Sequence, residues 1–172
     1  VNRVMTDHIS DLLFCPSEVS AKQLRKEGIK ESKINVVGDV MYDAVKQFSP
    51  IANKSSEILE KTGLESDKYI LATIHRAENT DNPSRLKAIF EAFMEIGNQI
   101  DVCIPMHPRT VKALKQINYY DEICNSIDVI DPVGFIDMLR LESNAKLIAT
   151  DSGGIQKEAY YSDVPCVTLR DT

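Results

Sequence analysis

The 172-residue sequence contains no tryptophan, only four cysteines and no apolar run close to the length of a membrane-spanning helix. A helix that crosses a bilayer needs about 20 consecutive apolar residues, so we expect no membrane span. Basic residues are in the minority, with 20 Lys and Arg against 26 Asp and Glu and a net charge of -6. Nucleic-acid binding normally needs a basic surface, so we also expect no nucleic-acid partner.

The four cysteines, Cys15, Cys103, Cys124 and Cys166, include no CxxC pair. This spacing argues against a zinc ribbon and against a thiol redox motif. Cys15, Cys103 and Cys166 lie in short apolar segments, which predicts free, buried thiols in a reducing compartment such as the cytoplasm. The remaining composition, 43% hydrophobic and 27% charged residues, is typical of a folded globular protein.

Seven short apolar runs alternate with longer amphipathic stretches. The runs cover residues 12–15, 34–37, 69–74, 102–106, 128–130, 146–150 and 166–169. Because these runs are continuous, they predict strands that are covered on both faces. The stretches between them predict helices over residues 17–27, 83–100, 134–141 and 154–161. The alternation predicts an α/β fold with a doubly wound, Rossmann-like parallel sheet.

The chain divides unevenly. Residues 67–172 hold five of the seven runs and form a nearly complete unit, and residues 1–38 hold the other two. Residues 49–56, with Pro50 and several serines, predict a connection between the two parts. Since the sequence starts at Val1 and stops just after the last run, we expect it to be a piece of a longer protein.

The strongest local motif is Thr150–Glu158, where a predicted strand leads through Ser152, Gly153 and Gly154 into a helix. A helix N-terminus offers unpaired N–H groups to anions, and glycines let a phosphate approach the backbone. A diphosphate is therefore the expected ligand of this motif. Glu158 lies about one turn further on and is suited to accept hydrogen bonds from sugar hydroxyls. The alternative is an ordinary strand-to-helix turn whose glycines serve packing.

Two histidines follow other predicted strands. His75 and Arg76 come after the run 69–74, and His107 comes after the run 102–106. If the sheet is parallel, these residues share one edge with Ser152, where His and Arg would suit phosphate charge. The alternatives are a solvated surface cluster and, for His107, a structural turn. The residues alone thus predict a site for an anionic, nucleotide-like ligand and name no reaction.

The motifs taken together resemble a known family, the non-hydrolysing UDP-N-acetylglucosamine 2-epimerases. The resemblance is carried by Asn2-Arg3, Phe14-Cys15-Pro16, Val37-Gly38-Asp39, Thr73–Asn79, His107-Pro108, Thr150–Ala159 and Leu169–Thr172, in this order. It implies a GT-B-type architecture, in which two Rossmann-like domains face a cleft. Residues 1–43 would be the tail of the N-terminal domain, and residues 44–172 most of a truncated C-terminal, UDP-binding domain.

The resemblance also implies roles for individual residues in UDP binding. Ser152, Gly153 and Gly154 would hold the diphosphate, and Glu158 would hold the ribose hydroxyls. His75 would lie beside the phosphates and the sugar as an active-site residue.

Further roles follow from the same resemblance. Arg3 matches an arginine that lines the catalytic cleft. Met138 and Val133 fall beside the uracil, with Met138 in place of the family's usual phenylalanine. Arg76 and His107 match positions that help bind a second, activating UDP-N-acetylglucosamine in bacterial members, but Ala77 replaces the usual second arginine.

The implied reaction interconverts UDP-N-acetylglucosamine and UDP-N-acetylmannosamine. UDP is expelled with loss of the C2 proton to give 2-acetamidoglucal, and UDP then adds back after the proton returns on the other face. No cofactor and no metal are expected. The family's acid/base carboxylates would precede Asn2, so this chain by itself should bind UDP at best. Members are commonly homodimers. A hydrolysing 2-epimerase, a GT-B glycosyltransferase and a nucleotide-binding regulatory module remain alternatives.

Overall fold

The computed structural model describes residues 2–171, which separate into two compact units that divide between Ala44 and Val45. The sequence places the division one residue earlier. The assignment of the units to an N-terminal and a C-terminal domain stays a prediction, and each unit is described by itself.

The first unit is a small parallel α/β element. Strands β1 (Leu13–Cys15) and β2 (Ile34–Val36) pair in parallel. Helices α1 (Asn2–Ile9) and α2 (Glu18–Lys26) and the short helix η1 (Glu31–Lys33) complete it. Ser17 caps α2 by accepting a hydrogen bond from the Ser20 amide. Its core is a small cluster around Cys15, Ala21, Leu24 and Ile29.

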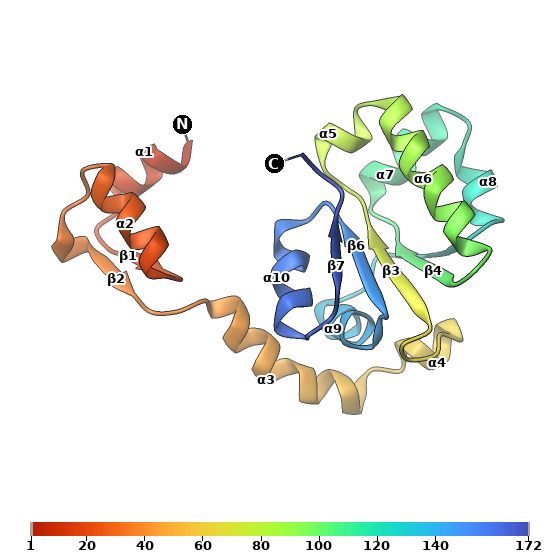
Figure 1. Ribbon diagram of the computed structural model, residues 1–172, viewed down its shortest axis with the longest axis horizontal. Helices are drawn as coiled ribbons and strands as arrows, with labels where there is room; N and C mark the ends of the chain where they lie inside the picture. Colours follow the sequence, from red (N-terminus) through yellow and green to blue (C-terminus); the bar gives the residue numbers. More distant parts are fainter. Residues whose placement is uncertain (1, 172) are drawn as a thin grey trace. The chain divides into compact units, whose positions relative to one another are not determined.

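The second unit contains a five-stranded parallel sheet in the order β5-β4-β3-β6-β7 (Figure 1). Its strands are β3 (Tyr69–Thr73), β4 (Asp101–Pro105), β5 (Asp128–Ile130), β6 (Leu147–Thr150) and β7 (Cys166–Thr168). The order reverses between β3 and β6, which is where open α/β sheets bind ligands at their carboxyl ends. All seven predicted strands are confirmed, and so is the doubly wound, Rossmann-like fold class.

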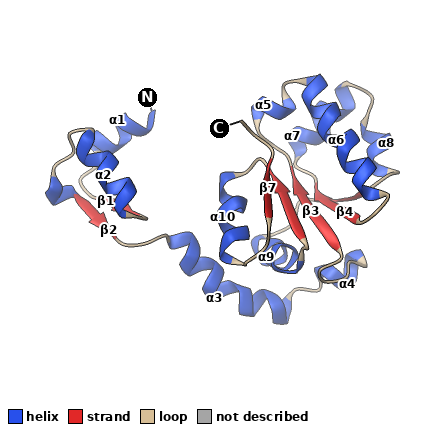
Figure 2. Ribbon diagram, in the orientation of Figure 1, coloured by secondary structure: helices blue, strands red, loops and turns tan. Residues whose placement is uncertain are grey.

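Helices cover both faces of this sheet (Figure 2). The covering helices include α6 (Pro83–Gly97), α7 (Pro108–Gln116) and α8 (Tyr120–Cys124) on one face and α4 (Ile58–Thr62), α9 (Phe135–Asn144) and α10 (Gly153–Tyr161) on the other. Helix α5 (Ala77–Thr80) follows β3, and α3 (Val40–Ser55), which begins before the division, packs on α9. Successive strand residues alternate between the two faces. Ala72 packs with the cluster of α6, α7 and α8, whereas Tyr69 and Leu71 pack with that of α4, α9 and α10.

The predicted connection at residues 49–56 is wrong, because helix α3 runs through it with Pro50 in its interior. A proline inside a helix removes one hydrogen bond and is disfavoured. Here Val45, Phe48 and Ala52 pack in one cluster with Leu139 of α9, and their burial outweighs this cost. Tertiary packing has overridden local propensity.

The buried state predicted for Cys166 is also wrong. Cys15 and Cys103 are buried, but Cys166 is exposed, as is Cys124. Cys166 lies on β7, which is the outermost strand of the sheet within residues 2–171 and whose three residues are all exposed. An apolar run therefore identified the strand correctly but not its position at the edge.

None of the helices in residues 2–171 has the length and apolar character that a membrane span requires.

Candidate functional site

The carboxyl ends of β3 and β6 bring the two strongest sequence motifs together. Thr73 and Thr150 are paired in register at these ends, and their hydroxyl oxygens lie 2.6 Å apart. His75 follows β3 and Ser152 follows β6. The predicted shared edge is therefore present, at the point where the strand order reverses.

Ser152 is the N-cap of α10. Its backbone is extended, its Oγ accepts a hydrogen bond from the Ile155 amide at 3.4 Å, and its own amide donates to Thr150 Oγ1 at 2.9 Å. The next two residues, Gly153 and Gly154, are the first of the helix, where N–H groups have no partner within the helix. These amides and the helix dipole make the N-terminus of α10 attractive to an anion.

Two arginines converge on this helix start. A Cβ built at Gly153 would lie 3.7 Å from Nη1 of Arg170 and 3.8 Å from Nη2 of Arg76. These are ordinary contact distances, so a side chain would fit and packing does not require a glycine. For Gly153, this disfavours the interpretation that the glycine serves packing. The space above Gly153 instead lies beside two cationic groups, as a phosphate site requires.

Asp151 organises the segment that carries His75. It is fully buried and accepts hydrogen bonds from the amides of His75 and Arg76, at 3.0 and 2.9 Å, and from Nδ2 of Asn79 at 2.9 Å. His75 Nδ1 lies 3.3 Å from the second oxygen of Asp151. Asp151 therefore fixes both the backbone and the ring of His75.

Asn79 extends this network to the neighbouring strand. Its Nδ2 also donates to the Leu169 carbonyl, just beyond β7, at 2.9 Å. Its Oδ1 accepts from Arg85 Nε at 2.6 Å, and Arg85 in turn pairs with Asp171 at 2.7 Å. One buried amide thus links the segments that follow β3, β6 and β7.

His107 lies beside His75, with a distance of 5.7 Å between the ring centroids. It is the N-cap of α7, and its Nδ1 accepts from the Arg109 amide at 3.1 Å. Arg109 itself is engaged with Asp81 at 2.8 Å. Whether Arg76 and His107 bind an activating nucleotide sugar stays a prediction.

The two residues predicted beside the uracil lie at the start of α9. Val133 precedes the helix and Met138 is in its first turns, with its amide donating to the Gly134 carbonyl at 2.9 Å. Both are half-buried and pack against the same core cluster as Ile155, in the first turn of α10. Their predicted position beside the uracil stays a prediction.

Glu158 lies on α10, half-buried, and interacts with a carboxyl group that the sequence analysis did not single out. This is Glu142 on α9, which is fully buried. Burial, and then the charge of Glu158, raises the pKa of Glu142 to about 9, and burial also raises the pKa of Glu158. The signal in the sequence is a glutamate in helical register with Leu139 and Ala145, both on the buried side of α9.

This raised pKa predicts a pH-dependent stability. The unfolded chain loses the Glu142 proton near pH 4.5, whereas the folded chain keeps it up to about pH 9. Folding therefore takes up a proton in this window, and the free energy of unfolding falls as pH rises through it. We expect Glu142→Gln to remove this loss, so that its stability relative to wild type rises by up to about 1.4 kcal/mol per pH unit. Urea denaturation over this range tests it, and parallel curves for both proteins would contradict it.

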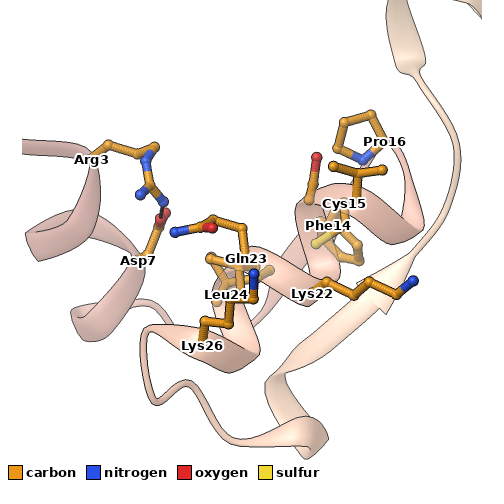
Figure 3. A pocket seen from close by; sticks show the side chains of 12 residues that line it. Arg3, Asp7, Phe14, Cys15, Pro16, Lys22, Gln23, Leu24 and Lys26 are labelled. Carbon is orange, nitrogen blue, oxygen red and sulfur yellow. Dashed lines mark hydrogen bonds and ion pairs between the residues drawn. The ribbon is translucent and has the colours of Figure 1, made fainter.

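Arg3 lies in the first unit, where it is half-exposed and paired with Asp7 and Glu27, each at 2.5 Å. It lines a pocket of about 770 Å³ together with residues of β1 and α2. Figure 3 shows its guanidinium beside the Asp7 carboxylate. Its predicted catalytic role stays a prediction.

Sequence reasoning assigned no role to Asp151, Asn79, Arg170 or Glu142. Asp151, Asn79 and Arg170 stood inside the quoted motifs, but only their contacts in the structure show what they do. In the described part of the chain, no group of three or more His, Cys, Asp or Glu side chains is placed to hold a metal ion.

The chain is similar to proteins of one family over its whole length. A family model described as UDP-N-acetylglucosamine 2-epimerase matches residues 1–172. The UDP-N-acetylglucosamine 2-epimerase of Methanocaldococcus jannaschii is 48% identical over 177 residues, covering 99% of this chain and 48% of the relative. The UDP-2,3-diacetamido-2,3-dideoxy-D-glucuronate 2-epimerase of Pseudomonas aeruginosa is 44% identical over 174 residues, covering 99% and 47%.

A solved structure supports the same relationship. The crystal structure of the Methanocaldococcus jannaschii UDP-GlcNAc 2-epimerase in complex with UDP-GlcNAc and UDP matches with a TM-score of 0.90 and 47% identity, covering 99% of this chain and 48% of that one. This chain thus spans about half the length of the curated relatives it matches. The predicted GT-B-type fold class agrees with this likeness, and the chain belongs to the UDP-N-acetylglucosamine 2-epimerase family.

Proposed function

We propose that this chain supplies the UDP-binding part of an isomerase that interconverts UDP-N-acetylglucosamine and UDP-N-acetylmannosamine. The observation that carries the proposal is the convergence of Arg76 and Arg170 over Gly153, at the N-terminus of α10. Family membership supports the choice of a UDP-sugar as the ligand. In this proposal Ser152, Gly153 and Gly154 hold the diphosphate.

The remaining contacts to UDP follow the same edge of the sheet. Glu158 accepts from the ribose hydroxyls, and Val133 and Met138 border the uracil. His75, held by Asp151, lies beside the phosphates and the sugar.

The proposed mechanism is non-hydrolysing elimination and re-addition. The C1–O bond breaks with its electron pair going to the β-phosphate of UDP, the C2 proton goes to a base, and a C1–C2 double bond forms in 2-acetamidoglucal. Re-addition of UDP follows protonation of C2 on the opposite face. Because charge develops on the departing diphosphate, the amides and guanidinium groups at α10 lower this barrier. Donors of this type are typically worth about 3 to 4 kcal/mol each.

We assign no base for the C2 proton to this chain, whose curated relatives are about twice as long. We therefore propose that the isolated 172-residue chain binds UDP without turning substrate over. A homodimeric assembly and a cytoplasmic location belong to the same proposal. The first rests on the family resemblance, and the second on the absence of a CxxC pair and of disulfides between the cysteines.

The reaction is tested on the protein as the cell makes it, incubated with UDP-N-acetylglucosamine in deuterated water. We expect UDP-N-acetylmannosamine with deuterium at C2, because the returning proton comes from solvent. Free N-acetylmannosamine and UDP would identify a hydrolysing enzyme, and transfer of the sugar to an acceptor would identify a glycosyltransferase. If the protein neither exchanges deuterium into the sugar nor forms any product, the proposed function is contradicted.

A second candidate function differs from the first in the sugar of the UDP-sugar substrate. The Pseudomonas aeruginosa relative, at 44% identity, is a 2-epimerase for UDP-2,3-diacetamido-2,3-dideoxy-D-glucuronate. The two candidate reactions share UDP and the C2 centre and differ in the substituents of the sugar. Running the deuterium assay with both nucleotide sugars separates them, since only the true substrate should incorporate label at a rate that matches epimer formation.

A further inference from the structure

Asp151 is a fully buried carboxylate to which the mechanism above assigns no step. It follows β6 directly and precedes Ser152, the N-cap of α10. A carboxylate removed from water needs hydrogen-bond donors or a cation to stay charged. Asp151 has N–H donors on one oxygen and an imidazole ring beside the other, and the two oxygens therefore have different tasks.

The Oδ2 oxygen of Asp151 is filled by N–H donors. It accepts from the His75 amide at 3.0 Å, from the Arg76 amide at 2.9 Å and from Asn79 Nδ2 at 2.9 Å. Because a carboxylate has about two acceptor sites on each oxygen, three donors leave no room for a fourth. This oxygen is therefore fixed in place by the segment that follows β3.

The Oδ1 oxygen has spare capacity, and the His75 ring lies beside it. Oδ1 accepts the longer arm of the bond that the His75 amide shares between the two oxygens, at 3.2 Å. Nδ1 of the His75 ring lies 3.3 Å away, at ion-pair distance. A ring nitrogen that turned its lone pair toward a carboxylate at this distance would be repelled. The hydrogen of a neutral His75 ring therefore lies on Nδ1, and Nε2 carries the lone pair.

The neighbouring His107 is held in the opposite form. The two ring centroids are 5.7 Å apart, and Nδ1 of His107 accepts a hydrogen bond from the Arg109 amide at 3.1 Å. Since a backbone N–H can only donate, Nδ1 of His107 carries the lone pair and Nε2 carries the hydrogen. The two histidines thus differ in which ring nitrogen is left to meet a ligand.

We propose that Asp151 is a positioning residue that holds the hydrogen on Nδ1 of His75 and so leaves Nε2 as the ring atom that meets the diphosphate. The inference rests on the proposed function, since it needs UDP beside His75. The ring is accessible to a ligand, because the His75 side chain is 41% exposed, whereas Asp151 is fully buried. Asp151 therefore acts through the imidazole and not on the ligand itself.

This arrangement suits the charge that develops as UDP leaves. His75 takes up a second proton from solvent on Nε2, and the resulting imidazolium has the Asp151 carboxylate at Nδ1 and the phosphate at Nε2. A buried carboxylate fixes the tautomer of a histidine and stabilises its cation in the same way in serine hydrolases. When the C1–O bond breaks, its electron pair goes to a β-phosphate oxygen, and the Nε2–H of His75 donates a hydrogen bond to that oxygen.

Nitrogen NMR of isotope-labelled histidine rings tests the assignment directly, in the protein as the cell makes it and without UDP. The His75 and His107 signals are identified by their loss in His75→Gln and His107→Gln, and they are read where the rings are neutral. We expect the hydrogen on Nδ1 of His75 and on Nε2 of His107, which is the internal reference. A neutral His75 with its hydrogen on Nε2 overturns the inference, whether or not any Asp151 variant folds.

Asp151→Asn changes the partner of Nδ1 from an acceptor into a donor. The asparagine carbonyl oxygen takes the place of Oδ2 with its three donors, so the NH₂ group faces the ring. We expect the tautomer of His75 to reverse. We also expect kcat for epimerisation to fall roughly 100-fold or more, with KM for the UDP-sugar within about threefold of wild type.

Asn79→Ala is the matched control, because it removes a donor from Oδ2 of Asp151 and leaves the Oδ1 side unchanged. It should lower stability in urea and keep the wild-type tautomer of His75. If a folded Asp151→Asn keeps the wild-type tautomer and kcat, or if Asn79→Ala also reverses the tautomer, Asp151 has only a structural role. An active enzyme with the other tautomer overturns the inference alone. A wild-type protein with the expected tautomer but no epimerase activity toward either UDP-sugar overturns the proposed function, and this role with it.

Discussion

Gly153→Asp is expected to abolish UDP binding while leaving the fold intact. The backbone at Gly153 does not have a positive φ, and a Cβ there meets nothing closer than 3.7 Å. An aspartate would place its carboxylate between Arg76 and Arg170, in the position that we propose for phosphate. Acidic residues are also favoured in the first turn of a helix, so thermal stability should be unchanged or higher.

The size of the effect follows from the bonds that the phosphate would lose. Hydrogen bonds to charged groups contribute about 1.5 to 3 kcal/mol each, and losing two corresponds to an affinity at least about 100-fold weaker. Gly153→Ala is the control, since it fills the same space without charge and should cost less than about tenfold. Calorimetry with UDP gives both values. If Gly153→Asp bound UDP about as tightly as Gly153→Ala, the phosphate would have to bind elsewhere.

Asp151→Ala is expected to cause the largest loss of stability. The substitution removes the shared acceptor of three N–H donors, the part-buried amides of His75 and Arg76 and the buried side chain of Asn79. Each such group costs about 1 to 3 kcal/mol, and with partial relaxation we expect a total of about 3 to 5 kcal/mol in the free energy of unfolding.

The matched control for this experiment is Asp131→Ala. Asp131 is an exposed aspartate that follows β5, a strand of the same sheet, and its loss should change stability by less than about 0.5 kcal/mol. Urea denaturation of both variants gives the comparison. If the two variants were equally stable, the hydrogen bonds of Asp151 would have no net effect on folding.

The strands of this protein could be predicted from the sequence because they are continuous apolar runs, a pattern that burial in a parallel sheet imposes. What the pattern could not show was position within the sheet. Cys166 belongs to a run like the others, yet within residues 2–171 β7 is the outermost strand and the Cys166 thiol is exposed. Likewise, Pro50 and the serines around it indicate a loop, and only the packing of α3 on α9 explains the helix.

The candidate site was predictable where its residues follow strands directly, as His75 and Ser152 do. The residues that support them were not, because their roles depend on contacts across the sheet. Arg170 lies 17 residues after Gly153 in the sequence but comes within contact distance of a Cβ built there. Glu142 is recognisable as unusual only once α9 is packed on α10.

The buried amide of Asn79 has a consequence for changing what this protein accepts. It joins Asp151, Arg85 and the Leu169 carbonyl, so a substitution at any of these positions disturbs the others, and paired replacements should behave non-additively. In directed evolution toward a different sugar nucleotide, single substitutions within this network should therefore be poorly tolerated. Productive changes should accumulate in surface segments outside this network, where one residue can be exchanged at a time.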